Sequence, residues 1–475
     1  MNGPPAQVPP NPKARRLKIV ALIFVGLIAL YSIYRYALAR SIQTRIDAIH
    51  RARFPATGVE LDKWYVQPPA GENAADVYTQ AFAHYDAWTN QDAHFSPPAG
   101  VNDRTKYVAP PKEKRDLLPI FGEAKLPPDY GPLSEEQEKL VAEYLADNAK
   151  TLKLLHQAAS MKYCRYPVDL TKGVMASSRH RGSLRPAEEL LELEVIHALD
   201  QKQQAQAVES AVAALAAAHS LSQEPLLISY LFQVSYEGLA LENIKRIVNT
   251  ASLTDSQLVQ LSAALQESDN VPSLMRALVG ERCIQGDVFQ DIRRGKTAIK
   301  ELYTLVNSFH FANDEPELPI LLVATYKISG LLDLDYRTYL DSMDGFVVAS
   351  QFPPPQNMAA AQVMETIVQR LPRRRVLSRS FMTALDLAVV NACRNAAQLR
   401  NAQVVLAIER YRLANNKLPD QLSDLAPTFL ASVPVDPFDG KPLRYKKLPD
   451  SYTVYSVGEN RKDDYTTDIA FTVEE

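Results

Sequence analysis

Residues 385–412 read LDLAVVNACRNAAQLRNAQVVLAIERYR, and their apolar positions recur at steps of three and four residues. This is the period of one face of an α-helix. The positions concerned are Leu385, Val389, Ala392, Ala396, Leu399, Ala402 and Leu406. Asn415 and Asn416 can adopt the left-handed conformation that ends a helix, and Pro419 prevents its continuation. We therefore expect one amphipathic helix of about 30 residues that begins near Ser380.

The period of the pattern changes to two after this helix. Residues 443–446 and 452–457 are predicted strands, joined by a turn at residues 448–451, and alternating apolar residues predict a third strand at 469–473. Such a sheet has one apolar face, which the amphipathic helix is able to cover. Residues 376–475 are therefore expected to form a small α+β module, a long helix packed on a three-stranded antiparallel sheet.

Short motifs occur in a fixed order along the same module. They are Tyr411-Arg412, Leu418-Pro419, Asp436-Pro437-Phe438, Gly440, Pro442, Tyr445, Ser456, Gly458 and Asp468-Ile469. In this order they resemble the globular domain of the type II secretion system major pseudopilin. That family carries its membrane segment at the start of the long helix, behind a processed leader, and residues 379–392 contain no such leader. The resemblance therefore implies the globular head, and not a polymerising subunit.

The resemblance also implies a calcium site in the acidic loop of the head. The loop here offers Asn460, Asp463, Asp464 and Asp468, and Ca²⁺ prefers six to eight oxygen ligands of this kind. Asp464 and Asp468 are the best candidates. The loop departs from the family pattern at Thr466, where a carboxylate is expected, and at Asn460, which replaces an Asp. A solvated acidic turn is the alternative.

The N-terminal part contains an uncharged apolar run at residues 19–34, preceded by four basic residues within 13–18. Residues 36–39 extend the run while Arg35 reaches toward the interface, so that residues 19–38 form a transmembrane anchor. The alternative is a cleaved signal peptide, since residues 37–39 read Ala-Leu-Ala. We expect a single span in the inner (cytoplasmic) membrane, with the N-terminus inside and the bulk in the periplasm or outside.

Composition narrows the class of partner. The chain has 475 residues, a net charge of −3 and an isoelectric point near 6.3, so it lacks the basic field of a nucleic-acid-binding protein. Its three cysteines are too few and too scattered for a disulfide framework, and we expect them to be buried. The expected partners are the membrane and an unidentified protein, with no nucleic acid.

Residues 134–375 are expected to form an α-helical domain, either a non-repetitive bundle or an irregular α-solenoid. Capping boxes at residues 134–137 and 254–257 mark two helix starts, and Pro186 is expected in the first turn of another helix. The alanine-rich segment 205–219 should allow close helix packing. This part of the chain is similar to membrane-anchored helical bacterial proteins of unknown function.

Between the anchor and the helical domain, a helix is predicted at residues 73–88 and a long Pro-rich connection at 90–132. The whole chain is therefore expected to have five segments. The segments are a disordered basic tail (1–18), the anchor (19–38), a juxtamembrane helix, short helix and connection (39–133), the helical domain (134–375) and the pseudopilin-like module (376–475).

The sequence contains none of the common catalytic motifs. Glu194-x-x-His197 has the spacing of a di-iron helix but lacks a second copy. Ser177, Ser178 and His180 are interpreted as a polar loop; His156 and His219 as packed or surface residues; and Glu188, Glu189 and Glu192 as a solvated helix face. No catalytic or cofactor-binding residue is predicted.

Two functions remain open. The first is a non-catalytic envelope protein, of structural or interaction type, whose helical domain binds a partner and whose head docks a partner or stabilises the C-terminus. The second is an envelope enzyme, such as a hydrolase, with a dispersed site in the helical domain. A concave pocket with converging carboxylates, or a perturbed histidine among Glu194, His197 and His219, would favour the enzyme. A continuous apolar groove would favour binding.

Overall fold

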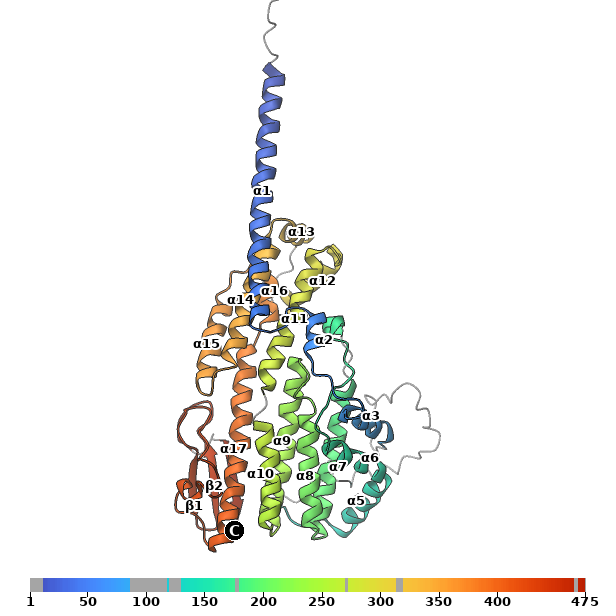
Figure 1. Ribbon diagram of the computed structural model, residues 1–475, viewed down its shortest axis with the longest axis vertical. Coiled ribbons are helices and arrows are strands. Elements are labelled where there is room, and N and C mark those ends of the chain that lie inside the picture. Colours follow the sequence, from blue (N-terminus) through green and yellow to red (C-terminus); the bar gives the residue numbers. More distant parts are fainter. Residues whose placement is uncertain are drawn as a thin grey trace, which may run out of the picture.

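The computed structural model describes residues 12–85, 118, 130–175, 179–269, 272–312, 319–464 and 469–474. Figure 1 shows a long N-terminal helix that projects from an elongated helical body, with a small sheet at the opposite end of that body. The predicted fold class is confirmed. The chain is mainly α-helical, with an apolar N-terminal helix and a three-stranded antiparallel sheet near the C-terminus.

The helices up to residue 312 include the N-terminal helix and form the first part of this body. They are α1 (Pro12–Arg51), α2 (Gly58–Trp64), α3 (Ala74–His84), α5 (Glu135–Asp147), α6 (Ala149–Ala159), the 3-10 helix η3 (Leu170–Met175), α7 (Arg179–Asp200), α8 (Gln204–His219), α9 (Leu227–Thr250), α10 (Asp255–Asp269), α11 (Ser273–Arg293) and α12 (Ile299–Ala312). The predicted helix at 73–88 corresponds to α3, with Asn73 as its N-cap. Residues 86–88, and most of the predicted connection at 90–132, lie outside the described residues.

The remaining elements complete the body and the sheet. They are α13 (Ile320–Ile328), α14 (Leu331–Ala349), α15 (Gln356–Gln369), α16 (Val376–Phe381), α17 (Leu385–Asn415), the 3-10 helix η4 (Leu422–Leu425), β1 (Arg444–Leu448), β2 (Ser451–Ser456) and β3 (Ile469–Glu474). The strands follow the order β1-β2-β3.

Helix α1 contains the predicted apolar run and continues without a break into the predicted juxtamembrane helix. It is long and apolar enough to span a membrane. The large apolar side chains between Leu17 and Tyr36 are exposed, whereas Leu38 and Ile42 are buried. The C-terminal part of α1 packs on α14. Residues 376–415 meet the same test of length and hydropathy, but α17 is packed among α9, α10 and α15 within the body.

Helix α8 lies at the centre of the helical body, in contact with α6, α7, α9 and α10. Its alanines make this possible because a small side chain lets a neighbouring backbone approach. Ala207, Ala211 and Ala214 are fully buried. The predicted close packing of the alanine-rich segment is therefore confirmed.

Both predicted capping boxes are present, but the prediction that Pro186 lies in the first turn of a helix was wrong. Ser134 and Gln137 bond reciprocally at the start of α5, and Thr254 and Gln257 do the same before α10. Pro186 lies inside α7, which begins at Arg179. Contacts of the first turns with the body stabilise this earlier start and outweigh the backbone hydrogen bond that the proline removes.

The predicted start of the long helix also requires correction. The chain forms the short helix α16 first, and α17 begins only at Leu385, after Ala384 in the left-handed conformation with φ of 61°. The Asp335 carboxylate of α14 accepts hydrogen bonds from the amides of Leu377 and Ser378, which fixes α16 as a separate turn. The predicted end is confirmed, because Asn416 has a φ of 54°.

Helix α17 covers the apolar face of the sheet, as expected. It contacts β2 and β3, and Tyr452 faces Val473 across that strand pair, both buried. The sheet also touches the helical body, because Asn249 of α9 donates to the Thr472 carbonyl and accepts from the Glu474 amide. One apolar core runs through the helices into the sheet. The domain boundary at 375/376 stays a prediction.

Candidate functional site

A cavity of about 620 Å³ lies among α3, α6, α8 and α10. Small and apolar side chains form most of its wall, including Ala158 of α6, Val212 and Ala216 of α8 and Ala264 of α10. Alanines at facing positions of three helices leave space that larger side chains would fill. The volume and the mainly apolar wall are those of a small-molecule or side-chain binding site.

A few polar groups line this cavity. Among the described residues, neither the Tyr78 hydroxyl nor Nδ1 of His219 has a hydrogen-bond partner, although both atoms are buried. Burial lowers the pKa of His219, and the nearby Glu267 carboxylate opposes this shift only in part. The imidazole is therefore neutral at pH 7. Both side chains line the cavity, but these two atoms are enclosed by protein and do not open into it.

The cavity does not contain an activated nucleophile among its described residues. Burial raises the pKa of the Cys164 thiol to about 12, so the thiol stays protonated at neutral pH. The Ser220 hydroxyl donates to the Ala217 carbonyl and lies 3.0 Å from the Tyr166 hydroxyl, without a base beside it. Acyl transfer needs a nucleophile paired with a base, and this wall does not provide one.

Buried carboxylates on α7 and α9 correct the prediction of a solvated glutamate face. Glu188 is 1% exposed, and neither of its oxygens has a hydrogen-bond partner among the described residues. Burial raises its pKa well above the usual range and raises the pKa of Glu192 to about 7. Glu237 of α9 is fully buried, also with a pKa raised to about 7 by burial. The prediction failed because α9 covers this face of α7.

A second buried charge centre joins the start of α7 to the α8–α9 turn. The Glu224 carboxylate lies 2.7 Å from Nε2 of His180 and accepts hydrogen bonds from Arg181 and Ser229. Burial opposes ionisation, but these donors lower the pKa of Glu224. His180 thus belongs to α7 and not to the predicted polar loop, whose Ser177 and Ser178 lie outside the described residues. The network fixes the turn that borders the cavity.

The Glu194-x-x-His197 spacing does not form a metal site in the described residues. Glu194 instead bonds across the helix interface to Nε2 of His156, at 2.7 Å, and accepts from Ser210. The hydrogen bond to Glu194 raises the pKa of His156. Nδ1 of His197 has no partner among the described residues. His156 and Glu194 therefore act as a structural pair between α6, α7 and α8.

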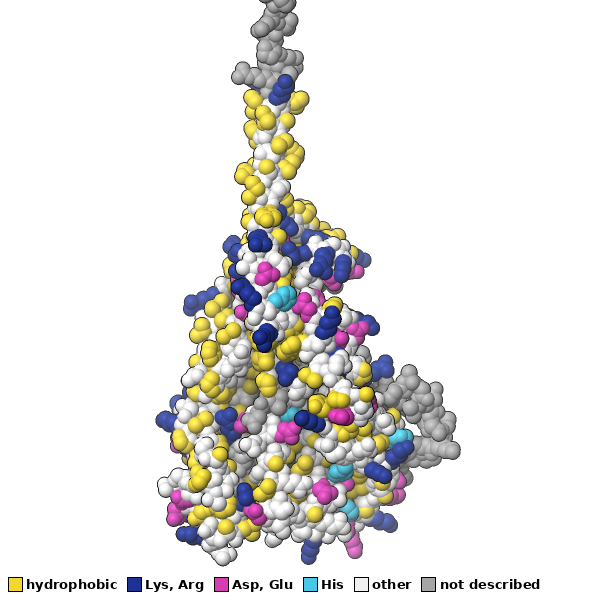
Figure 2. All heavy atoms as spheres, viewed as in Figure 1, with side chains coloured by type: hydrophobic (Ala, Val, Ile, Leu, Met, Phe, Trp, Pro, Cys, Tyr) yellow, Lys and Arg dark blue, Asp and Glu magenta, His cyan; other side chains and the backbone are white. Residues whose placement is uncertain are grey.

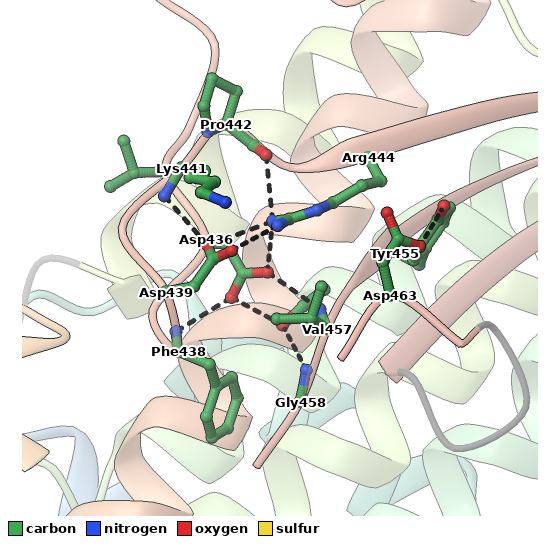
Figure 3. A network of polar contacts seen from close by, with 12 residues as sticks. Asp436, Phe438, Asp439, Lys441, Pro442, Arg444, Tyr455, Val457, Gly458 and Asp463 are labelled. Atoms are coloured by element: carbon green, nitrogen blue, oxygen red, sulfur yellow. Dashed lines mark hydrogen bonds and ion pairs between the residues drawn. The ribbon is translucent and has the colours of Figure 1, made fainter. Parts of the chain in front are cut away.

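Asp436 is the centre of a buried polar network in the C-terminal module, shown in Figure 3. Its carboxylate accepts from the amides of Phe438 and Val457, at 2.9 Å each, and from the Ser456 hydroxyl at 2.8 Å. Arg444 of β1 donates to it at 2.8 Å. The side chain is fully buried, and it ties the loop before β1 to the end of β2.

The acidic loop lies beside this network. The Asp463 carboxylate accepts from the Tyr455 hydroxyl at 3.0 Å, and the Asn460 amide donates to Asp464 at 3.0 Å. Asp468 lies outside the described residues, which contain no group of three or more His, Cys, Asp or Glu side chains arranged to hold a metal. The structure thus brings Asn460 and Asp464 together, while Asp463 is directed to Tyr455. The calcium site stays a prediction.

All three cysteines are free thiols, with Cys283 and Cys393 buried as expected and Cys164 half-buried at the cavity wall. No family model, curated protein or solved structure matches this chain. The pseudopilin resemblance therefore stays a prediction that depends on the motifs of residues 411–469. The geometry of the chain itself must support any functional proposal.

Proposed function

We propose that this chain is a membrane-anchored envelope protein of the non-catalytic, interaction type. The helical domain binds its partner in the cavity among α3, α6, α8 and α10, and the pseudopilin-like head holds the C-terminal part on the body. The partner contributes an apolar group that fills the cavity.

The cavity wall is the observation that carries this proposal. It combines about 620 Å³ of space with a mainly apolar wall of small side chains from several helices. An apolar group that enters the cavity gains affinity because its surface is removed from water. The thiol and hydroxyl at the wall lack activation, which favours binding over turnover.

Binding of the apolar fluorophore 1-N-phenylnaphthylamine to the full chain in lipid nanodiscs tests the proposal. Empty nanodiscs supply the lipid background. Ala216→Trp fills the cavity and should abolish the saturable signal. Ala205→Trp, at an exposed position of the same helix, should leave it unchanged. A full-length protein without any saturable signal above the nanodisc background would contradict the proposal.

One observation favours the alternative, an envelope hydrolase. His219 is a neutral imidazole at a cavity wall, which is the state that a general base requires. A hydrolase predicts rapid, stoichiometric labelling by a fluorophosphonate or by iodoacetamide at pH 7, lost in His219→Gln. The binding proposal predicts slow labelling that is the same in both proteins.

We propose further that the acidic loop binds calcium, as the resemblance implies, through Asn460, Asp463, Asp464 and Asp468. Calcium titration of the full chain followed by thermal melting tests this. The full chain is used because α17 packs on the helical body as well as on the sheet. Asp464→Ala should abolish a calcium-dependent rise of the melting temperature. No rise at millimolar calcium in the unsubstituted protein would rule the site out.

The proposed topology places the N-terminus inside and the body in the periplasm. The number of basic residues does not decide the orientation, because five arginines follow the apolar run. The short, densely basic tail before the run is typical of ordinary export signals and supports this orientation. A reporter that is active only in the cytoplasm, fused after Glu475, should be inactive. Activity of that fusion would reverse the assignment.

A further inference from the structure

Helix α13 presents an apolar surface to solvent. Ile320, Leu321, Leu322 and Ile328 are each between 53% and 74% exposed in a helix of nine residues. Single exposed apolar residues are common, but Ile320, Leu321 and Ile328 lie within about 100° of one another around the helix axis and form one apolar face. The face opposite is fixed to the body, because Val323 and Tyr326 are buried there.

The orientation of α13 is set by polar contacts on this buried side. The Tyr326 hydroxyl donates to the Asp335 carboxylate of α14 at 2.5 Å. Asp335 in turn bonds to the amides at the start of α16. The apolar residues of α13 therefore face outward because the inner side is held by α14, and rotation about the helix axis would break these bonds.

The end of α13 is attached to α1. The Ile328 carbonyl accepts hydrogen bonds from the Tyr31 hydroxyl and, at 3.0 Å, from Arg35. The following Gly330 has a φ of 89° and lies so close to α1 that a Cβ there would be 2.9 Å from the Tyr34 ring. The exposed apolar part of α1, residues 17–36, covers about 30 Å at 1.5 Å per residue, the thickness of a hydrocarbon layer. Arg35 thus lies at the edge of that layer and Tyr31 about 7 Å inside it, and the end of α13 is level with both because Ile328 bonds to them.

Figure 1 shows α13 at the end of the body from which α1 projects, and Figure 2 shows apolar and basic side chains at that end of the body. We propose that the exposed face of α13 is a membrane-surface contact, with Ile320, Leu321 and Ile328 inserted among the lipid chains at the interface. The inference rests on the proposed anchoring by α1. In this arrangement the body is attached to the bilayer at two places, so that it cannot rotate freely about α1.

A lipid surface fits this face better than a protein does. The contacts of Ile328 with α1 make the face continuous with the apolar surface of the proposed span. The sequence between α12 and α13 contains Asp314, Glu315 and Glu317, so the contact depends on apolar insertion and does not require anionic lipid. Uncharged phosphatidylcholine is therefore a sufficient membrane for a test.

The test uses the full chain in phosphatidylcholine nanodiscs with a polarity-sensitive fluorophore on Leu321→Cys, an exposed position where a label leaves the core intact. Val363→Cys, which is 60% exposed on α15, is the matched control, and Ile28→Cys reports on the span. Labelling of the unsubstituted protein gives the background from its three cysteines. Each sample is quenched with aqueous iodide and, separately, with brominated lipid.

We expect the labels at 321 and 28 to be quenched by brominated lipid and shielded from iodide at least about fivefold relative to the label at 363. If the label at 321 is quenched by iodide as strongly as the label at 363, while the label at 28 is quenched by brominated lipid, the proposed surface contact is wrong and the proposed membrane span is retained. If the label at 28 is also quenched by iodide, the proposed membrane span is wrong, and the surface contact that rests on it is wrong too. If 321 is shielded from both quenchers, a protein or a second copy covers α13, and the lipid contact is again wrong.

Discussion

Arg35 of α1 forms an ion pair with Asp333 of α14, with 2.8 Å between Nη2 and the carboxylate. Asp333 is 3% exposed and also accepts from Arg293 of α11 at 2.7 Å. One buried carboxylate thus joins the proposed span to two helices of the body. Because of this junction, the direction in which α1 projects is fixed by the packing of α11 and α14.

We predict that Asp333→Ala lowers the free energy of unfolding by about 2–3 kcal/mol, because it removes a charge-assisted hydrogen bond from Arg293 and an ion pair with Arg35 at a buried position. Asp341→Ala is the matched control, since Asp341 pairs with Arg45 of α1 at a site where the carboxylate is 51% exposed. An exposed pair contributes less than about 1 kcal/mol. Chemical denaturation in detergent, followed by circular dichroism, measures both. Equal losses in the two variants would show that burial of Asp333 is unimportant.

Gly330→Ala should destabilise the attachment of α1. The substitution places a side chain at a φ of 89° and a Cβ within 3.1 Å of Tyr34 and Leu38. The left-handed conformation alone accounts for about 1–2 kcal/mol. Gly295→Ala isolates that contribution, because Gly295 has a φ of 78° and open space around it. We expect Gly330→Ala to lose at least about 1 kcal/mol more than Gly295→Ala, and faster proteolysis between α1 and α2. Similar losses would contradict close packing on α1.

The buried glutamates predict that stability falls as pH rises. Burial raises the pKa of Glu237 from 4.5 to about 7, so between these pH values the folded chain keeps a proton that the unfolded chain releases. The free energy of unfolding then decreases by about 1.4 kcal/mol per pH unit for such a group. Glu188, whose pKa is raised further, acts in the same direction.

Glu237→Gln should remove the share of Glu237 from this slope. Its amide has a partner available, because the Asn395 side chain that now donates to Glu237 has an Oδ1 without a partner among the described residues. Denaturation at pH 5, 6, 7 and 8 measures the slope. Glu209→Gln, at an exposed position of α8, should retain the full slope. A slope unchanged by Glu237→Gln would mean that Glu237 is ionised in the folded chain.

Local signals in the sequence predicted much of the fold. The 3.6-residue period of α17, the capping boxes and the alternation in β3 each depend on neighbouring residues, and the structure confirms them. The strand β2 is also present, but it is buried on both faces and does not alternate. The break at Ala384 was not predictable in this way. It depends on Asp335, which is far away in sequence and bonds the amides of α16.

The candidate site could not be predicted for the same reason. Its wall combines residues between Val66 and Ser268, and the cavity exists only once four helices are packed. The burial of Glu188 likewise depends on α9, whereas its acidic neighbours suggested a solvated face. Glu237 did carry a signal, since it is the one charged residue in the stretch 227–241 of α9.

Asp436→Ala should be the most destabilising of these substitutions, by about 3–5 kcal/mol, because Arg444 and several other donors lose a buried anionic partner. Asp439→Ala is the matched control. Asp439 also pairs with Arg444 and accepts from the Lys441 amide, but it is not fully buried, so we expect a smaller loss of about 2 kcal/mol.

The shape of the transition in Asp436→Ala also tests the boundary at 375/376. Because α17 packs on both the sheet and the helical body, and Asn249 joins α9 to β3, the head and the body should unfold in one step. Differential scanning calorimetry should then show a single shifted peak. A separate early peak would mean that residues 376–475 form an independent domain, and that the shared core contributes little to the stability of either part.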